Sequence, residues 1–196
     1  MGGTRRSASP TENVSFHEYT NYLGITLCLY TGVQIGELCG LLWKDVDFEN
    51  QSIHVRRTIQ RIKSTTGDSK TELTSLEYHG NTPERVIPLP QFIMTLLKDY
   101  KSISENDYII SRGDKPIEPR NMQYHFKRLL ENANVSQRGF RATRHTFAIR
   151  ALESGFDIKT LSEILGHASP VVTLKSYSHM LSESKQRSME SLVALH

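Results

Sequence analysis

An arginine, a histidine and a tyrosine near the C-terminal end of the chain have the types and spacing needed to act on a phosphodiester. Arg144 lies in Arg-His-Thr-Phe-Ala, His167 in Leu-Gly-His and Tyr177 in Tyr-Ser-His. A guanidinium grips phosphate oxygens through a fixed fork of donors, and positive neighbours turn a phenol into a nucleophile by stabilising the phenolate. A lone tyrosine, arginine or histidine at such a position is commonly structural. The set predicts attack of a tyrosine oxygen on a phosphodiester.

Short amphipathic helices must hold these side chains, and their ends are marked by glycines and caps. Gly155 and Gly166 follow two of the apolar-periodic segments, as C-terminal capping glycines do. Alternating residues 52–56 predict a strand, and the prolines in residues 85–90 predict a second strand at a sheet edge. Residues 63–71 are expected to form a loop or hairpin tip, and 107–110 a short extended piece. Helices are predicted over residues 16–30, 35–43, 91–101, 121–132, 141–153, 158–165, 170 to about 177, and 182 to about 192. The fold class is therefore mainly α with a small antiparallel β-sheet (α+β).

Composition favours a soluble globular protein. The chain has 196 residues, of which 37% are hydrophobic and 23% charged. No segment approaches the roughly 18 to 20 apolar residues that a membrane span needs, so no membrane partner is expected. Residues 1–15 lack an apolar core and are interpreted as a flexible leader or cloning remnant. Cys28 and Cys39 lie in apolar helical patterns, which favours buried reduced thiols over a disulfide or a metal site.

Positive charge is concentrated in one segment of the chain. The net charge is +3, but residues 111–150 carry nine Lys or Arg and three Asp or Glu, a net of +6. Such a segment suits a DNA backbone, to which binding is driven largely by counterion release; a solvated helix face is the alternative. Four side chains are candidates for phosphate contacts that carry no sequence information: Arg120, Lys127, Arg128 and Arg138.

As a set, these motifs resemble the catalytic domain of the tyrosine site-specific recombinases, the phage integrase family. The resemblance extends over about residues 16–192. It implies a recombinase catalytic domain over residues 16–180 and a C-terminal helix or tail, residues 181–196, that docks onto a neighbouring protomer or folds back in cis. Members of the family usually carry an N-terminal core-binding domain, which this chain has no room for and is expected to lack.

Three positions depart from the pattern of the family. Gln34 stands in Thr-Gly-Val-Gln-Ile-Gly-Glu where the family has its first catalytic arginine, whereas Glu37, the expected buried helix partner, is kept. Arg141 replaces the histidine of His-x-x-Arg, and it cannot shuttle a proton near neutral pH. Because Arg141 and Arg144 are three residues apart, they share a helix face and could form a paired phosphate clamp. The adjacent His145 is expected to point inward and be structural.

The third departure concerns the general acid that protonates the leaving 5′ oxygen. The family places a lysine on a β-hairpin just before the strand that begins at Arg85, and the corresponding position falls on or near His79. A histidine can serve as a general acid at neutral pH, although an exposed loop histidine is an equal alternative. Lys70, nearer the hairpin tip, is the second candidate if the hairpin register differs.

The resemblance implies DNA integration or site-specific recombination by a phage or mobile-element integrase. Tyr177 would form a 3′-phosphotyrosyl intermediate and free a 5′ hydroxyl, without metal or cofactor. The expected partners are double-stranded DNA, further protomers in a tetramer on paired sites, and accessory DNA-bending proteins in the bacterial cytoplasm at the nucleoid. Three alternatives remain: a catalytically impaired member that only binds DNA, a type IB topoisomerase, and a purely structural helical module.

Overall fold

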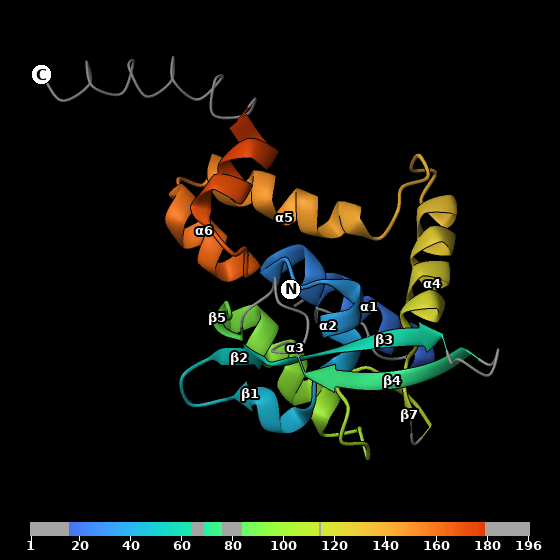
Figure 1. Cartoon of the computed structure of the whole chain (residues 1–196). Helices are drawn as coiled ribbons and strands as arrows, with labels where there is room; N and C mark the ends of the chain where they lie inside the picture. The colour runs from blue at the N-terminus through green and yellow to red at the C-terminus, as the bar shows by residue number, and fades with distance from the viewer. Residues whose placement is uncertain (1–15, 64–68, 76–83, 114, 179–196) are drawn as a thin grey trace, which may run out of the picture.

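A computed structural model describes residues 16–63, 69–75, 84–113 and 115–178 (Figure 1). The predicted leader and the predicted helix over residues 182–192 lie outside the described residues. Within these ranges, no helix combines the length and apolar character that crossing a bilayer requires.

Helices make up most of the described chain. They are α1 (Phe16–Thr31), α2 (Ile35–Gly40), the 3-10 turn η1 (Trp43–Asp45), α3 (Gln91–Lys101), α4 (Pro119–Asn132), α5 (Arg141–Glu153) and α6 (Ile158–Leu165). Residues 170–178 are also helical and are called the Tyr177 helix below. The predicted positions of these helices are therefore confirmed, apart from the length of α2.

All strand pairing in the described residues is antiparallel. The strands are β1 (Val46–Asp47), β2 (Ser52–Val55), β3 (Arg57–Lys63), β4 (Ser69–Ser75), β5 (Arg85–Pro88), β6 (Ser111–Arg112) and β7 (Lys115–Pro116). They form a three-stranded sheet in the order β1-β2-β5 and two separate ribbons, β3-β4 and β6-β7. The predicted α+β class is confirmed. The strand that begins at Arg85 lies at the sheet edge, where its prolines cost no ladder hydrogen bond.

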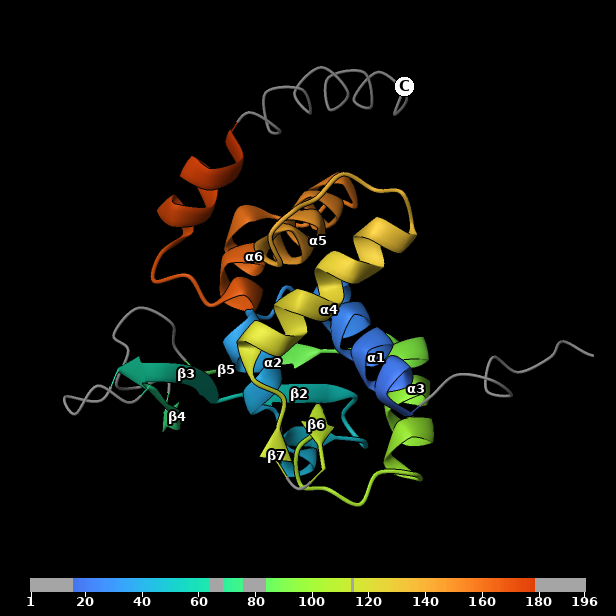
Figure 2. The ribbon, with the colours of Figure 1, turned by 90° about the vertical axis from the view of Figure 1, so that its right-hand side faces the viewer.

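The main hydrophobic core surrounds α1. Leu23, Leu27 and Cys28 of this helix are at most 1% exposed, because α1 is covered on opposite sides. Helices α5 and α6 lie on one side of it, and the three-stranded sheet with α3 lies on the other (Figures 1 and 2). A second and much smaller cluster lies between α5, α6 and the Tyr177 helix, and consists of Ala148, Ala151, Leu161, Leu165 and Tyr177.

Helix α2 is shorter than the sequence predicted, since it ends at Gly40 and not near Trp43. The helix does not continue because the next two N–H groups have other acceptors. The Leu42 N–H donates to the Asp45 carboxylate at 2.9 Å, and the Trp43 N–H donates to the Asp107 carbonyl at 2.9 Å. The prediction followed apolar periodicity alone and was wrong over this segment.

Glycines on α2 allow strand β3 to approach closely. A Cβ atom at Gly36 would come within 2.9 Å of the Ile59 carbonyl oxygen, and one at Gly40 within 3.3 Å of the Arg57 carbonyl oxygen. The β3-β4 hairpin is thereby held directly against the helix that begins after Gln34. Of the residues expected in the loop or hairpin tip, Lys63 belongs to strand β3, and Ser69, Lys70 and Thr71 belong to strand β4.

Candidate active site

Four of the predicted site residues line one cavity of about 440 Å³: Gln34, Arg141, Arg144 and His167. They come from three separate segments of the chain, namely the start of α2, the first turn of α5 and the residue after Gly166. The cavity therefore exists only in the folded protein. With two guanidinium groups, an imidazole and an amide on its walls, it suits an anion.

The end of α6 fixes the position of His167. Gly166 adopts the left-handed conformation, with φ 68°, and this closes a Schellman motif in which His167 N–H donates to the Ser162 carbonyl and Gly166 N–H to the Glu163 carbonyl, both at 3.0 Å. The last two carbonyls of the helix accept from arginine side chains: Ile164 from Arg85 and Leu165 from Arg144, both at 2.6 Å. The four terminal carbonyls of α6 therefore all accept hydrogen bonds. The end of the helix is fixed, and so is the backbone position of His167.

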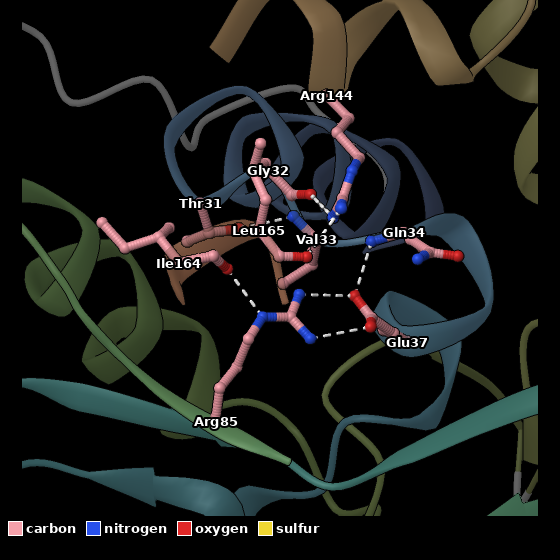
Figure 3. Close-up of polar contacts among 9 residues, drawn as sticks. All are labelled: Thr31, Gly32, Val33, Gln34, Glu37, Arg85, Arg144, Ile164 and Leu165. Carbon is pink, nitrogen blue, oxygen red and sulfur yellow. Dashed lines mark hydrogen bonds and ion pairs between the residues drawn. The ribbon is translucent and has the colours of Figure 1, made fainter. Parts of the chain in front are cut away.

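Arg144 connects two helix ends. Its terminal nitrogens donate to the carbonyls of Gly32, just after α1, and of Leu165, the last residue of α6, each at 2.6 Å (Figure 3). A guanidinium carries five N–H donors, and two of them are used by these carbonyls. Burial lowers the pKa of Arg144 from 12.5 to about 10, the Arg85 charge adds to this effect, and the Glu37 carboxylate opposes it. The group is still positive at neutral pH.

Glu37 and Arg85 form a buried ion pair behind the cavity. The carboxylate accepts from both terminal nitrogens of Arg85 at 2.8 Å, and neither side chain is more than 6% exposed (Figure 3). The bidentate geometry satisfies both charges, as burial demands. This pair connects α2 to β5, and the bond from Arg85 to the Ile164 carbonyl extends the connection to α6.

Gln34 is held by its backbone, and its side chain is exposed. Its N–H donates to the Glu37 carboxylate at 2.8 Å (Figure 3), which anchors the start of α2 to the buried pair. Gly32, two residues earlier, has φ 67°, and a side chain there would collide with Phe147 and Leu165. The local backbone therefore directs residue 34 towards the cavity irrespective of which side chain it carries.

His167 is neutral at physiological pH. Burial, and after it the charges of Arg144, Arg85 and Arg141, lower its pKa from 6.5 to about 4. Its Nδ1 lies 2.7 Å from the hydroxyl oxygen of Thr173. The imidazole therefore serves the cavity as a neutral hydrogen-bonding group and not as a cation.

Tyr177 lies beside the cavity but is not among the residues that line it. The side chain is 5% exposed and packs in the small apolar cluster between α5 and α6. Burial raises the pKa of its phenol above 10, while the charges of Arg144 and Arg141 act to lower it. The ring of His145 lies 5.2 Å from the Tyr177 ring. His145 is exposed, so the expectation that it points inward was wrong.

The candidate DNA-contacting residues divide between described and undescribed segments. Arg120, Lys127, Arg128 and Arg138 are all exposed, as phosphate contacts require. Lys70 lies on β4 opposite Ile62 of β3, which places it within the hairpin but leaves its side chain outside the description. His79 lies outside the described residues altogether.

Helix α4 combines positive charge with an exposed aromatic residue. Its inner side buries Met122 and Phe126, whereas Tyr124 is 58% exposed and lies 6.0 Å beneath the Arg128 guanidinium. Cation–π contacts of this kind hold a long side chain against the helix. Among the described residues, no group of three or more His, Cys, Asp or Glu side chains is arranged to hold a metal ion.

The fold and the cavity together define a mainly helical domain with an arginine- and histidine-lined cavity and a tyrosine on the adjoining helix. The chain belongs to the phage integrase family, whose family model matches residues 8–184. It is 30% identical over 184 residues to a XerC-like tyrosine recombinase of Caldanaerobacter subterraneus subsp. tengcongensis, covering 85% of this chain and 47% of that protein. It is 31% identical over 178 residues to the tyrosine recombinase XerA of Thermococcus onnurineus, covering 85% of this chain and 53% of that protein.

Solved structures agree with the family assignment at the level of fold. The Tn1549 transposon integrase, solved in complex with a circular intermediate DNA, superimposes with a TM-score of 0.72 at 24% identity, over 97% of this chain and 67% of that one. The XerA recombinase structure gives 0.63 at 24% identity, over 93% and 66%. The chain spans about half the length of the curated relatives it matches.

Two residues of the site were not predicted as site residues from the sequence. In the sequence, Arg85 was used only as the reference point for locating the hairpin lysine. In the structure, it forms the buried ion pair with Glu37. Thr173 contacts His167, and its spacing of four residues from Tyr177 on one helix was the available signal. For Arg85, the signal was a charged residue opening an otherwise apolar edge strand.

Proposed function

We propose that residues 16–180 are the strand-cleaving domain of a tyrosine recombinase that acts on double-stranded DNA. The observation that carries this proposal is the convergence of Gln34, Arg141, Arg144 and His167 on one cavity, with Tyr177 on the adjoining helix. Membership of the phage integrase family and the DNA-bound state of the structural relative support it. Integration or excision of a mobile element is the biological setting that this similarity favours.

The reaction exchanges one phosphodiester for another. The Tyr177 phenol gives up its proton to water as its oxygen attacks the scissile phosphorus, the bond from phosphorus to the 5′ oxygen breaks, and a 3′-phosphotyrosyl link forms. The departing 5′ oxygen takes a proton from a general acid, for which His79 and Lys70 are the candidates. Attack by a 5′ hydroxyl from a partner duplex reverses the step and returns the phenol. The covalent link keeps the bond energy, so neither metal nor nucleotide is needed.

Arg141 supplies the positive charge that Gln34 lacks. Arg141 and Arg144 are three residues apart in the first turn of α5 and line the same cavity. The charges of both act on the His167 imidazole and on the Tyr177 phenol. Two guanidinium groups on one helix face can hold two non-bridging phosphate oxygens and stabilise the charge that grows in the transition state.

Tyr177 must shift to reach a phosphate in the cavity, because its side chain is buried in the small cluster. The Tyr177 helix buries only Thr173 and Tyr177, and Val171, Val172 and Leu174 are between 44% and 54% exposed. With so few buried contacts around it, the Tyr177 side chain can leave the cluster at low free-energy cost while Thr173 stays docked. We place residues 181–196 as the segment that docks onto a neighbouring protomer of a DNA-bound tetramer and so couples this shift to assembly.

The second candidate function is DNA binding with impaired cleavage, and Gln34 is the observation that favours it. Loss of one guanidinium from a phosphoryl-transfer site can cost about 10³- to 10⁵-fold in rate. The exposed arginines and lysine of α4 would still provide DNA affinity. The two candidates differ only in whether a covalent complex forms.

A nicked suicide substrate separates the two candidates. The chain is incubated with attachment-site DNA carrying a nick near the crossover point, so that cleavage releases a short fragment and traps the protein on the DNA. A covalent band on a denaturing gel, absent with Tyr177→Phe, identifies the cleaving domain. Mobility shift without a covalent band identifies the impaired DNA binder, and appearance of the band with Gln34→Arg alone assigns the defect to that residue.

A further inference from the structure

Thr173 contacts the catalytic-site histidine from the same helix that carries Tyr177. Its hydroxyl oxygen lies 2.7 Å from Nδ1 of His167, and its side chain is completely buried. Thr173 and Tyr177 are four residues apart, so they lie one above the other on one face of the Tyr177 helix. They are also the only two buried residues among 170–178. The buried Thr173 hydroxyl is therefore placed to influence the His167 ring.

The direction of this hydrogen bond follows from the hydroxyl proton. A threonine hydroxyl has one proton to donate, and a buried polar group with no access to water is normally paired. Other hydroxyls in helices here donate to the carbonyl four residues earlier, as Ser176 does to Val172 at 2.9 Å. Among the described residues, the hydrogen-bond partner of the Thr173 hydroxyl is His167 Nδ1. With the hydroxyl proton directed to this nitrogen, Thr173 is the donor and Nδ1 carries no proton.

We propose that Thr173 is a positioning residue that holds His167 as the neutral tautomer protonated at Nε2, with this N–H available to the cavity. Once Nδ1 is occupied by the hydroxyl, Nε2 is the ring nitrogen left for a ligand on the cavity side. In the other tautomer, the cavity would face a bare nitrogen lone pair, which repels a phosphate oxygen. The catalytic consequence rests on the proposed function, whereas the tautomer itself does not.

The surrounding charges favour the same state of the ring. Arg141 and Arg144 of α5 and Arg85 of β5 act on His167 from the elements packed around it, and each disfavours a second proton on the ring. The imidazole is thus neutral, and a neutral imidazole donates only from the nitrogen that carries its proton. Thr173 determines which nitrogen that is.

The contact also connects His167 to the nucleophile. Because Thr173 precedes Tyr177 by one turn of the same helix, displacement of that helix from α5 and α6 would break the bond to His167. The Tyr177 side chain can turn out of the small cluster towards the cavity while Thr173 stays in place, so the donor that faces the phosphate remains fixed during attack as long as the helix stays docked.

Nuclear magnetic resonance of the full chain labelled with ¹⁵N-histidine measures the tautomer directly. The chain has eight histidines, and His167→Gln identifies the signals of His167 by their loss. Long-range ¹H–¹⁵N correlations should show a protonated Nε2 and an unprotonated Nδ1 between pH 5.5 and 8. Thr173→Ser, which keeps the hydroxyl, should preserve this pattern. Thr173→Val, which keeps the shape but not the hydroxyl, should give a mixture of both tautomers.

Ser176→Ala is the matched control, since it removes a hydroxyl from the same helix without touching His167. It should leave the His167 signals unchanged. A wild-type spectrum with the proton on Nδ1 would overturn the proposal, and so would a Thr173→Val spectrum identical to that of the wild type. The wild-type spectrum decides the question even if Thr173→Val does not fold.

Cleavage of the suicide substrate gives the functional readout. With DNA saturating, Thr173→Val should reduce the rate of covalent-complex formation about 10- to 100-fold with little change in DNA affinity, and Thr173→Ser should restore it. Equal rates for all three proteins would overturn the catalytic part of the proposal. If the wild type forms no covalent complex while the tautomer is as predicted, the cleavage function fails and the assignment of Thr173 stands.

Discussion

The proposed phosphate-binding residues and the proposed nucleophile are held by two very different parts of the molecule. Arg144 and His167 are fixed at the end of α6, whose four terminal carbonyls all accept hydrogen bonds, and behind them lies the buried pair of Glu37 and Arg85. Tyr177 lies on a helix that buries two side chains and contributes to a cluster of five buried residues. The first region is anchored to the main core, and the second is attached to its margin.

This difference matches the separate tasks of binding and attack. A group that stabilises a transition state must be fixed before the reaction, because reorganisation then costs nothing at the moment of reaction. A nucleophile that enters and leaves a covalent bond must be able to move, and weakly packed elements provide this. The expected effects of substitutions in the two regions therefore differ in kind, from loss of stability to loss of rate.

The largest effect is expected from breaking the buried pair. Glu37→Gln leaves the Arg85 charge buried without its partner, and the free energy of unfolding should fall by about 3 to 5 kcal/mol. Chemical denaturation monitored by circular dichroism measures this. Glu163→Gln is the matched control, because Glu163 pairs with Lys159 at 4.0 Å on the exposed face of α6, and it should cost no more than about 0.5 kcal/mol. Equal losses for the two variants would contradict the distinction between the regions.

The next effect tests whether Arg141 compensates for Gln34. Arg141→Gln should slow cleavage of the suicide substrate about 10²- to 10³-fold, as loss of one preorganised transition-state donor does, with little change in stability. Arg150→Gln removes the same charge from the other end of α5, where Arg150 lies over the Tyr30 ring, and should change the rate less than about threefold. If the two variants behave alike, Arg141 is a general DNA contact and not part of a phosphate clamp.

A smaller gain is expected from restoring a guanidinium at the start of α2. The backbone of residue 34 is fixed by the Glu37 carboxylate, so Gln34→Arg should place its charge at the cavity and raise the cleavage rate by about tenfold or more. Gln34→Glu adds a charge of the wrong sign and should lower the rate. Rates measured under single-turnover conditions give the comparison, and an unchanged rate with Gln34→Arg would show that the cavity is already complete.

The smallest effect concerns the pH dependence of stability. Because burial and three arginines lower the pKa of His167 to about 4 in the folded state, the unfolded chain takes up this proton first, near pH 6.5. Stability should therefore fall as the pH drops from about 6.5 to about 4, by on the order of 1 kcal/mol for a partly exposed group. Thermal unfolding of His167→Gln should show a shallower decline. His145→Gln controls for loss of a histidine from the same surface, and equal slopes for wild type and His167→Gln would contradict the shift.

Sequence patterns that depend on local chemistry predicted much of this fold. Gly155 and Gly166 marked helix ends because left-handed caps favour glycine, and the prolines near Pro88 marked an edge strand. A hairpin tip was expected over residues 63–71, but the extent of strands β3 and β4 was missed because they are largely polar and do not alternate. The end of α2 was missed because it depends on a local contact of Leu42 with the Asp45 carboxylate, and on the Asp107 carbonyl, which becomes a neighbour of Trp43 only after folding.

The site could be predicted by residue type but not by arrangement. Arg144 and His167 were selected for chemistry, and the cavity brings them together. The contacts of Arg144 with two backbone carbonyls and the burial of Tyr177 arise from packing between segments far apart in the chain. The same is true of His145, whose exposed position beside Tyr177 depends on how the Tyr177 helix folds back onto α5. Such contacts leave no local pattern in the sequence.

Mapping the residue that becomes joined to DNA tests the central claim most directly. The chain has eight tyrosines, and digestion of the trapped suicide complex with protease and nuclease leaves a nucleotide on the one that attacked. Mass spectrometry should find this nucleotide on the peptide that contains Tyr177, and in greater yield with Gln34→Arg. A nucleotide on any other tyrosine, or none in a complex that binds the DNA and carries Gln34→Arg, would contradict the assignment of Tyr177 as the nucleophile beside the arginine- and histidine-lined cavity.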